Sequence, residues 1–181
     1  MDAGAQSYQK YLSGDDQGMA ELIALYKDGL MLYLAGLTHD VFSAEELTED
    51  TFFKLMVKKP RYRDSGRFKA WLYAIARNVC HDEWRRQSTL VALPEEQLGE
   101  VQSLEQSYLH EEDRIAVHRC MARLNPDYGQ VLWLKEFEDF DNAQIARIMG
   151  KSRRQVEMLL YRAKASLKAE LEKEGFCYEN Q

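Results

Sequence analysis

Apolar side chains recur at helical spacing along much of the chain. They are found every three or four positions from Met19 to Leu37, and again along residues 68–79. This spacing gives an α-helix one apolar face that can be buried. No stretch shows the sustained alternation of a half-buried strand bounded by hairpin turns. The three prolines, Pro60, Pro94 and Pro126, fall where a helical pattern breaks. The pattern predicts an all-α fold.

Local signals predict where helices of the first half begin and end. Ser43 with Glu46 three residues later has the spacing of a capping box, which predicts a helix start at Ser43. That helix should end near Lys59, because Pro60 disfavours helical geometry in the residue before it. The next helix starts after a polar loop, and its predicted buried stripe comprises Phe68, Leu72, Ile75 and Val79. Its other faces are expected to carry Lys69, Tyr73, Arg77, His81 and Arg85. The helical signal stops after Arg86.

An acidic segment separates two helical regions. From Gln87 to His118 there are seven acidic residues and one basic residue, with Pro94 and Gly99 among small polar residues. Such a composition is typical of a flexible linker. We expect two small helical domains, residues 1–88 and 107–181, joined by a linker over residues 89–106. The linker should grade into a helix near Ser107.

The second domain contains a predicted helix-turn-helix. Before it, Asn125 and Pro126 are typical of a helix start, with Asn as the cap and Pro in the first turn of a helix running to Phe137. Further on, Asp141 can cap a two-turn helix, and Gly150 stands where a helix end needs positive φ. Ser152 and Gln155 form a second capping box at the start of a longer helix.

The longer helix divides into a buried face and a basic face. Its inward positions are expected to be Val156, Leu159 or Leu160, Ala163 and Leu167. Its outward residues can reach base edges and phosphates in a major groove. They are Arg153, Arg154, Glu157, Met158, Tyr161 and Arg162. Arg153 and Lys164 are expected to contact phosphate alone. An ordinary helical hairpin with a solvated basic face is the alternative.

The charge distribution indicates that these helices bind nucleic acid. Formal net charge is −6, which alone argues against nucleic-acid binding. Between Lys58 and Arg86, however, nine cations face three acids, and between Arg147 and Lys168 seven cations face one acid. The loop before the third helix combines cations and rings that can hold single-stranded nucleic acid. These residues are Arg61, Tyr62, Arg63, Ser65, Arg67 and Lys69, followed by Tyr73 and Arg77.

Three segments carry a resemblance to a known family. They read "AEELTEDTFFKLM" at 44–56, "FKAWLYAIARNVCHDEWRR" at 68–86, and "LNPDYGQVLWLKEFEDFDNAQIARIMGKSRRQVEMLLYRAKASLKAEL" at 124–171. The first two resemble region 2, and the third resembles region 4, of the extracytoplasmic-function sigma factors of bacterial RNA polymerase. Departures include Glu49 where the family usually has Gln, Ala74 where it often has Arg, and Lys151 at a turn position that is usually apolar.

The resemblance implies three sets of site residues. The polymerase-docking set falls on Leu47, Glu49, Asp50, Phe53 and Lys54. The set for the melted −10 element falls on Arg61, Tyr62, Arg63, Asp64, Ser65, Arg67, Phe68, Lys69, Tyr73, Arg77 and Asn78. The set for the −35 duplex falls on Ser152, Arg153, Arg154, Gln155, Glu157, Met158, Arg162 and Lys164. An exposed acidic run that is merely solvated is the alternative for the docking helix.

The resemblance also implies the partners: core RNA polymerase, promoter DNA and an anti-sigma factor. The sequence shows no nucleophile with its base, no phosphate loop and no metal-ligand spacing among His39, His81, His110 and His118. We therefore expect no catalytic residue, metal or cofactor. Three unpaired cysteines and no apolar span predict a cytoplasmic protein that does not insert into a membrane. The alternative function is a stand-alone helix-turn-helix regulator with an N-terminal sensing domain.

Overall fold

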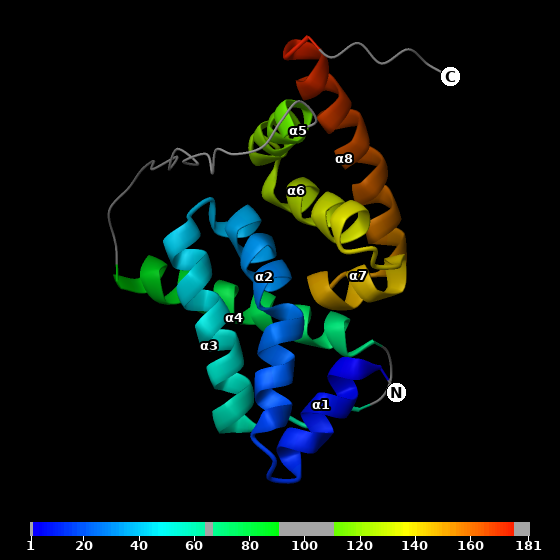
Figure 1. Cartoon of the computed structure of the whole chain (residues 1–181). Coiled ribbons are helices and arrows are strands. Elements are labelled where there is room, and N and C mark those ends of the chain that lie inside the picture. Colours follow the sequence, from blue (N-terminus) through cyan, green and yellow to red (C-terminus); the bar gives the residue numbers. More distant parts are fainter. Residues whose placement is uncertain (1, 64–66, 91–110, 176–181) are drawn as a thin grey trace.

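Every element in the described part of the chain is helical, which confirms the predicted all-α fold (Figure 1). The computed structural model describes residues 2–63, 67–90 and 111–175. Its elements are α1 (Ala3–Leu12), α2 (Gln17–Thr38), α3 (Val41–Lys58), α4 (Phe68–Leu90), α5 (Glu111–Ala122), α6 (Pro126–Leu132), the π-helix η1 (Trp133–Phe137), α7 (Asn142–Met149) and α8 (Arg153–Lys173).

The first domain is built on the pair formed by α2 and α3, with α1 and α4 packed against it (Figure 1). Leu22 and Leu34 of α2, Leu55 of α3 and Leu72 of α4 are all fully buried. Burying one such side chain stabilises the fold by roughly 1.5–3 kcal/mol. On α4, Phe68, Leu72 and Val79 are buried as predicted, whereas Ile75 is only half-buried.

Helix α1 was not predicted, and it anchors the loop before α4. Asp2 caps two helices at once, because its carboxylate accepts hydrogen bonds from Ala5 N at 2.8 Å and from Phe68 N at 2.7 Å. The Tyr8 hydroxyl donates to the Pro60 carbonyl at 2.8 Å, across 52 positions. Burial raises the pKa of Tyr8 to about 12, so this hydroxyl remains a donor at neutral pH.

Two predicted helix boundaries in the first domain are wrong. Helix α3 begins at Val41, because Asp40 is its cap and accepts from Ser43 N at 2.9 Å. Ser43 therefore lies inside the first turn, and its hydroxyl also donates to Asp40. Helix α4 continues to Leu90, past the predicted end at Arg86. In the extension, the Gln87 side-chain amide donates to Glu83 Oε1 at 3.2 Å, and the Ser88 hydroxyl donates to the Arg85 carbonyl at 2.9 Å.

The end of α3 matches its prediction. The helix stops at Lys58, and Lys59 adopts a left-handed conformation with φ of 43° directly before Pro60.

The second domain has the predicted caps. The Asn125 side chain accepts from Asp127 N at 3.0 Å, with Pro126 in the first turn of α6. Both helices of the helix-turn-helix, α7 and α8, begin with a capping box, the first formed by Asp141 and the second by Ser152. Gly150 ends α7 at φ 63°, the left-handed conformation that its position was predicted to need.

The two domains pack directly on each other. Helix α7 lies against α4, and α6 lies against α2 (Figure 1). Buried residues of both domains form one continuous apolar cluster. Most of the predicted linker lies in residues 91–110, outside the described part of the chain.

Candidate nucleic-acid and polymerase interfaces

Helix α8 presents its basic face to solvent. Val156, Leu160 and Ala163 are buried, and Leu159 is only half-buried, so Leu160 is the inward residue of that pair. The predicted −35 residues all lie on the exposed side of α8 or at its cap. They are Ser152, Arg153, Arg154, Gln155, Glu157, Met158, Arg162 and Lys164.

A shallow hollow of about 470 Å³ marks the centre of this face. It is lined by Arg154, Glu157, Met158, Tyr161 and Arg162. Tyr161 is 80% exposed, which is unusual for a large aromatic side chain on a helix. Its outward position was expected from the sequence, but the family resemblance did not assign it to the −35 set. The hollow combines guanidinium donors, a carboxylate acceptor and apolar surface, the groups that read base edges.

Two lysines near the helix-turn-helix form ion pairs with acids of the second domain. Lys164 Nζ lies 3.0 Å from Glu136 Oε1, and Lys151 Nζ lies 3.0 Å from Asp127 Oδ2. The Lys164–Glu136 pair is exposed and the Lys151–Asp127 pair is partly exposed, so each contributes at most ~1 kcal/mol. Lys151 in the turn is thus held by a neighbouring helix, and a phosphate could replace its partner at little cost.

The loop before α4 separates its cations from its rings. Arg61, Arg63 and Arg67 are exposed. Tyr62 instead packs on Phe68 and Trp71, with ring centroids 5.3 and 5.2 Å away. Two further residues of the predicted −10 set, Asp64 and Ser65, lie outside the described residues.

Phe68 itself is fully buried. It cannot contact DNA in this conformation, and the ring of Tyr62 packs edge-on against it.

One face of α4 is covered by the second domain. The sequence placed Tyr73 on an outward face, but it is 1% exposed, because Phe140 packs edge-on against it at 5.3 Å and Tyr33 of α2 packs on it at 5.1 Å. Burial and the neighbouring Glu138 carboxylate raise the pKa of Tyr73. Lys69 pairs with Glu138 at 2.8 Å, and Arg77 Nε lies 3.5 Å from Gln130 Oε1. The expectation that Tyr73 is solvent-facing is therefore wrong for this conformation.

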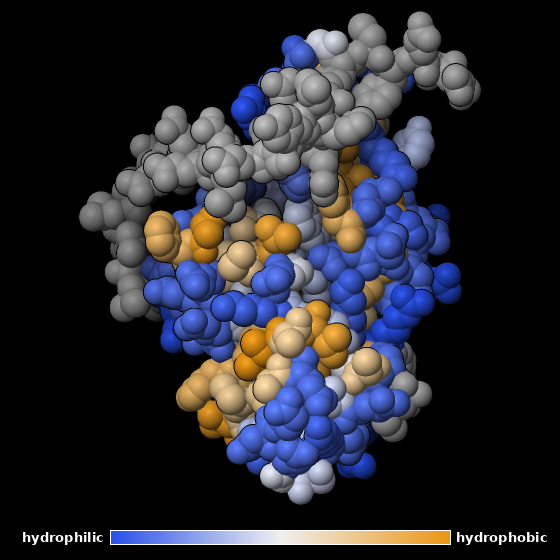
Figure 2. Space-filling model, viewed as in Figure 1, coloured by the Kyte–Doolittle hydropathy of each residue, from blue (hydrophilic) through white to orange (hydrophobic). Residues whose placement is uncertain are grey.

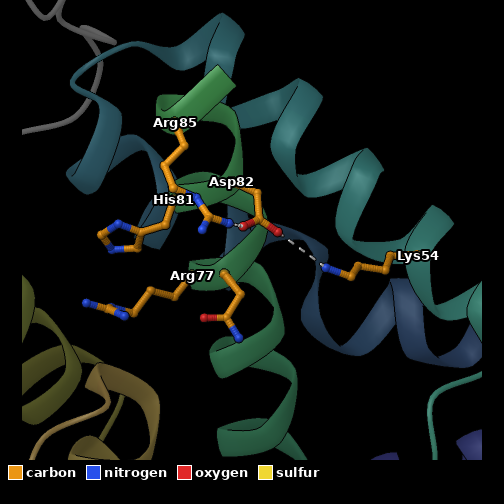
Figure 3. Close-up of a pocket in the computed structure, with 6 residues that line it drawn as sticks. Lys54, Arg77, His81, Asp82 and Arg85 are labelled. Carbon is orange, nitrogen blue, oxygen red and sulfur yellow. Dashed lines mark hydrogen bonds and ion pairs between the residues drawn. The ribbon is translucent and has the colours of Figure 1, made fainter. Parts of the chain in front are cut away.

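A basic cavity of about 520 Å³ lies beside this covered face, between α3 and α4 (Figure 3). Six residues line it: Lys54, Arg77, Asn78, His81, Asp82 and Arg85. Asp82 is the acid of the set and is shared between Lys54, at 3.9 Å, and Arg85. Burial, and next the Arg77 guanidinium, lower the pKa of His81. The spacing of Arg77, His81 and Arg85 on α4 is the sequence signal for this cavity, but the last two were not included among the candidates.

The predicted docking residues lie on α3, and four of the five are accessible. Glu49, Asp50 and Phe53 are exposed and Lys54 is partly exposed, whereas Leu47 is only 5% exposed and belongs to the core. Phe53 is 58% exposed.

Other large apolar side chains are exposed on α3 and on its neighbour α2. They are Leu25 and Leu32 of α2, and Val41, Phe42 and Val57 of α3. Figure 2 shows hydrophobic surface over α2 and α3 among hydrophilic residues. Exposed apolar surface of this kind is typical of a protein-protein interface.

Within residues 2–63, 67–90 and 111–175, no three His, Cys, Asp or Glu side chains are grouped so that they could hold a metal ion. None of the helices described is both long and apolar enough to span a bilayer.

Comparisons with known proteins agree on one family. A sequence model described as Sigma-70 region 2 matches residues 22–89, and one described as Sigma-70, region 4 matches residues 114–167. The chain is 27% identical over 151 residues to the ECF RNA polymerase sigma factor SigM of Bacillus subtilis. That match covers 82% of this chain and 92% of the relative.

Two solved structures have the same fold. The sigma factor RpoE in complex with the anti-sigma factor NepR, from Bartonella quintana, has a TM-score of 0.69 at 21% identity, covering 83% of this chain and 94% of that one. CnrH, in complex with the cytosolic domain of CnrY, has a TM-score of 0.70 at 21% identity, covering 95% and 99%.

Proposed function

This chain belongs to the extracytoplasmic-function sigma factors, and from that premise we propose how its residues share promoter recognition. As such a factor it directs core RNA polymerase to specific promoters and initiates transcription. It is a transcription initiation factor, and we propose that it carries no chemistry of its own and acts in the cytoplasm with the polymerase. The region 2 match at residues 22–89 occupies the part of the chain where a regulator would need its sensing domain.

The proposed division of labour follows the two domains. Residues 1–88 dock on the polymerase and hold the melted −10 element, residues 89–106 link the domains, and residues 107–181 read the −35 duplex. The observation that carries the −35 assignment is the exposed face of α8, directly after the glycine turn of a helix-turn-helix. A helix placed this way can enter a major groove with its N-terminal half.

Residues of the −35 face divide into two roles. Arg154 lines the hollow with Glu157 and Met158, so we assign it to base readout. Arg153 and Lys164, three turns apart on the helix, do not line the hollow, so we assign both to phosphates. Ser152 and Gln155 cap the start of α8, where the backbone N–H groups favour the binding of a phosphate.

Residues of the −10 face come from the loop and from α4. Arg61, Arg63 and Arg67 hold the strand, and Tyr62, half-buried against Phe68, contributes its exposed surface to contact with an unpaired base. The basic cavity would take backbone phosphates through its cationic side chains. Asn78, exposed on its rim, can bond either to a base or to the backbone.

The accessible face of α3 is the proposed docking site for the polymerase. Glu49 and Asp50 supply charge for steering, and Phe53 supplies the apolar anchor that most interfaces need. Leu47, which is buried, would act by holding α3 in place. We also propose an anti-sigma partner, since the sigma factor RpoE was solved with one.

A single experiment tests the central proposal. Core polymerase is incubated with a genomic fragment library, with and without the chain, and transcripts are mapped. New start sites that share two upstream elements support the proposed division between domains. If the full chain binds its promoters tightly without polymerase and fails to co-purify with core enzyme, the stand-alone regulator is correct instead.

A further inference from the structure

The loop that joins α3 to α4 is bonded to α1 at both of its ends. It spans residues 59–67, of which 59–63 and 67 are described. At its start, the Tyr8 hydroxyl donates to the Pro60 carbonyl at 2.8 Å. Directly after its end, the Asp2 carboxylate accepts from Phe68 N at 2.7 Å. A single helix therefore fixes the two points between which the loop residues of the proposed −10 set lie.

The Asp2 carboxylate uses a different oxygen for each helix that it caps. Oδ1 accepts from Ala5 N at 2.8 Å in the first turn of α1, and Oδ2 accepts from Phe68 N, the first residue of α4. A carboxylate at a helix start also interacts favourably with the positive end of the helix dipole, and here two helices share it. The point at which the chain enters α4 is therefore tied to the first turn of α1.

Tyr11 supports the start of the loop together with Tyr8. Its hydroxyl donates to the carbonyl of Met56, near the end of α3, at 3.2 Å. The Lys59 ammonium lies 5.0 Å from the centroid of the Tyr11 ring. Lys59 has a left-handed backbone with φ of 43°, which is costly for a residue other than glycine. Contacts from α1 to residues on both sides of Lys59 hold the chain in this turn.

The Tyr8 ring packs on the same two rings as a loop residue of the −10 set. Its centroid lies 5.6 Å from that of Phe68 and 5.4 Å from that of Trp71. Tyr62 of the loop packs on these two rings at 5.3 and 5.2 Å. Aromatic pairs at such separations attract one another. Helix α1 therefore also positions Tyr62, through the rings that both tyrosines contact.

Helix α1 is itself fixed to α2 and α4. Glu21 of α2 accepts from the Ser7 hydroxyl at 2.8 Å and pairs with Lys10 at 2.7 Å. Gly4 allows a close approach to the start of α4, since a Cβ atom there would lie 2.6 Å from the Phe68 ring. The helix that holds the loop is thus a rigid part of the first domain.

We propose that α1 is a positioning element for the melted −10 strand, in which Asp2 and Tyr8 hold the two ends of the loop. The exposed cations Arg61, Arg63 and Arg67 then need less ordering when a strand binds, which lowers the entropic cost of binding. The inference rests on the proposed assignment of this loop to the −10 element. The Sigma-70 region 2 match begins at residue 22, so α1 lies outside the matched segment.

The bridge from Asp2 to α4 is tested first by amide hydrogen exchange. In Asp2→Ser, the single hydroxyl oxygen keeps the α1 cap, because serine is as good a cap as aspartate, and the bond to Phe68 N is lost. Asp15→Ser makes the same change at an exposed acid before α2 and is the matched control. Exchange at Phe68 N–H should accelerate about tenfold or more in Asp2→Ser alone. Equal protection in all three proteins would overturn the proposal.

Positioning is tested by affinity for an unpaired strand. Holoenzyme is titrated with a promoter fragment from a start site found with the genomic library, prepared with its −10 segment unpaired. Tyr8→Phe serves as a second variant, because it removes the bond to Pro60 and keeps the ring. We expect Asp2→Ser and Tyr8→Phe each to weaken binding about two- to tenfold, and Asp15→Ser to bind like the wild type.

A second fragment separates positioning from a general loss of structure. The same holoenzymes are titrated with duplex DNA that carries the −35 element alone. Asp2→Ser and Tyr8→Phe should bind it as tightly as the wild type, because the loop takes no part in that contact. Equal losses on both fragments would mean that the variants merely destabilise the chain, and the positioning role would be rejected. Wild-type affinity of both variants for the unpaired −10 fragment would reject it as well.

The double variant tests whether the two bonds act on one loop. Once one end of the loop is free, fixing the other end restores less order. The loss for Asp2→Ser/Tyr8→Phe should therefore be smaller than the product of the two single losses. Losses that multiply would show two independent effects and contradict a shared positioning role.

Failure of the proposed function gives a different result. Arg61→Ala combined with Arg63→Ala removes two cations from the loop itself. If this variant binds the unpaired −10 fragment like the wild type, the loop does not hold the strand and the −10 assignment fails, whatever hydrogen exchange shows. If it loses affinity while Asp2→Ser and Tyr8→Phe do not, the assignment stands and positioning by α1 alone is rejected.

Discussion

The Tyr33 hydroxyl and the Gln130 side chain form a buried hydrogen bond of 2.7 Å across 97 positions of sequence. Gln130 is 5% exposed and Tyr33 is 1% exposed. The bond joins α2 of the first domain to α6 of the second. Burial raises the pKa of Tyr33, so its hydroxyl remains protonated at physiological pH. The domain contact is therefore a specific polar bond within an apolar surround.

Removing this hydroxyl tests how much the domains stabilise each other. Tyr33→Phe keeps the ring and leaves the buried Gln130 amide without that partner, so the free energy of unfolding should fall by about 1–3 kcal/mol. Denaturant unfolding measures the change. Tyr161→Phe, at an 80% exposed position, should change it by less than about 0.5 kcal/mol. Equal stability of the two variants would contradict the importance of this bond.

Charge reversal on α3 tests the docking assignment. Glu49→Lys combined with Asp50→Lys should weaken binding to core polymerase about tenfold, because two exposed attractive contacts become repulsive. The helical circular dichroism signal should not change, since both side chains are exposed. Affinity is measured by titration of labelled core enzyme.

Glu172 and Glu174 provide a control for net charge, as exposed acids at the end of α8. Glu172→Lys combined with Glu174→Lys makes the same charge change and should leave the polymerase affinity unchanged. If the α3 double variant binds as tightly as this control, the acidic face is simply solvated.

Base readout by Arg154 makes a distinct prediction from phosphate binding. Arg154→Ala holoenzyme should lose about 1–3 kcal/mol at one −35 base pair and relax the preference there. Arg153→Ala should weaken all sequences alike and reduce the salt dependence by about one unit. Transcription across a −35 library separates the two. A uniform loss with Arg154→Ala would make it a phosphate contact.

The pKa of His81 tests the electrostatics of the basic cavity. Burial and Arg77 lower this pKa, so the folded state favours the neutral imidazole. The associated stability is present above the unfolded pKa and is lost as pH falls through the folded pKa. The charged groups that act on the imidazole are Arg77, Asp127, Asp82 and Arg85.

An NMR titration should give His81 a pKa below its ordinary value of 6.5. Arg77→Gln should raise the pKa, because a nearby positive charge is removed. Arg86→Gln should leave it unchanged, since Arg86 pairs with Glu83 and is not among the groups acting on His81. A value at or above 6.5 in the wild type would refute this account of the cavity.

Local signals in the sequence determined most of the helices and the helix-turn-helix. Ser152, Gly150 and Asn125 act within a few residues of their own positions, so their roles were predictable from spacing alone. The exposed face of α8 was predictable for the same reason, because burial of Val156 and Ala163 fixes which side faces outward. Asp40 was missed as the cap of α3 because Ser43 offered an equally regular pattern nearby.

Contacts between distant residues were decided only by the tertiary structure. Nothing near Asp2 in the sequence indicates that it caps the start of α4, and α1 has no signal strong enough to predict it without that contact. The burial of Tyr73 is the clearest example. Its helical position marks it as outward on α4, but Tyr33 of α2 packs on its ring at 5.1 Å, and Phe140 and Glu138 of the second domain complete the cover. Helical periodicity reports the faces of one helix, whereas the partner that covers a face depends on how separate domains pack.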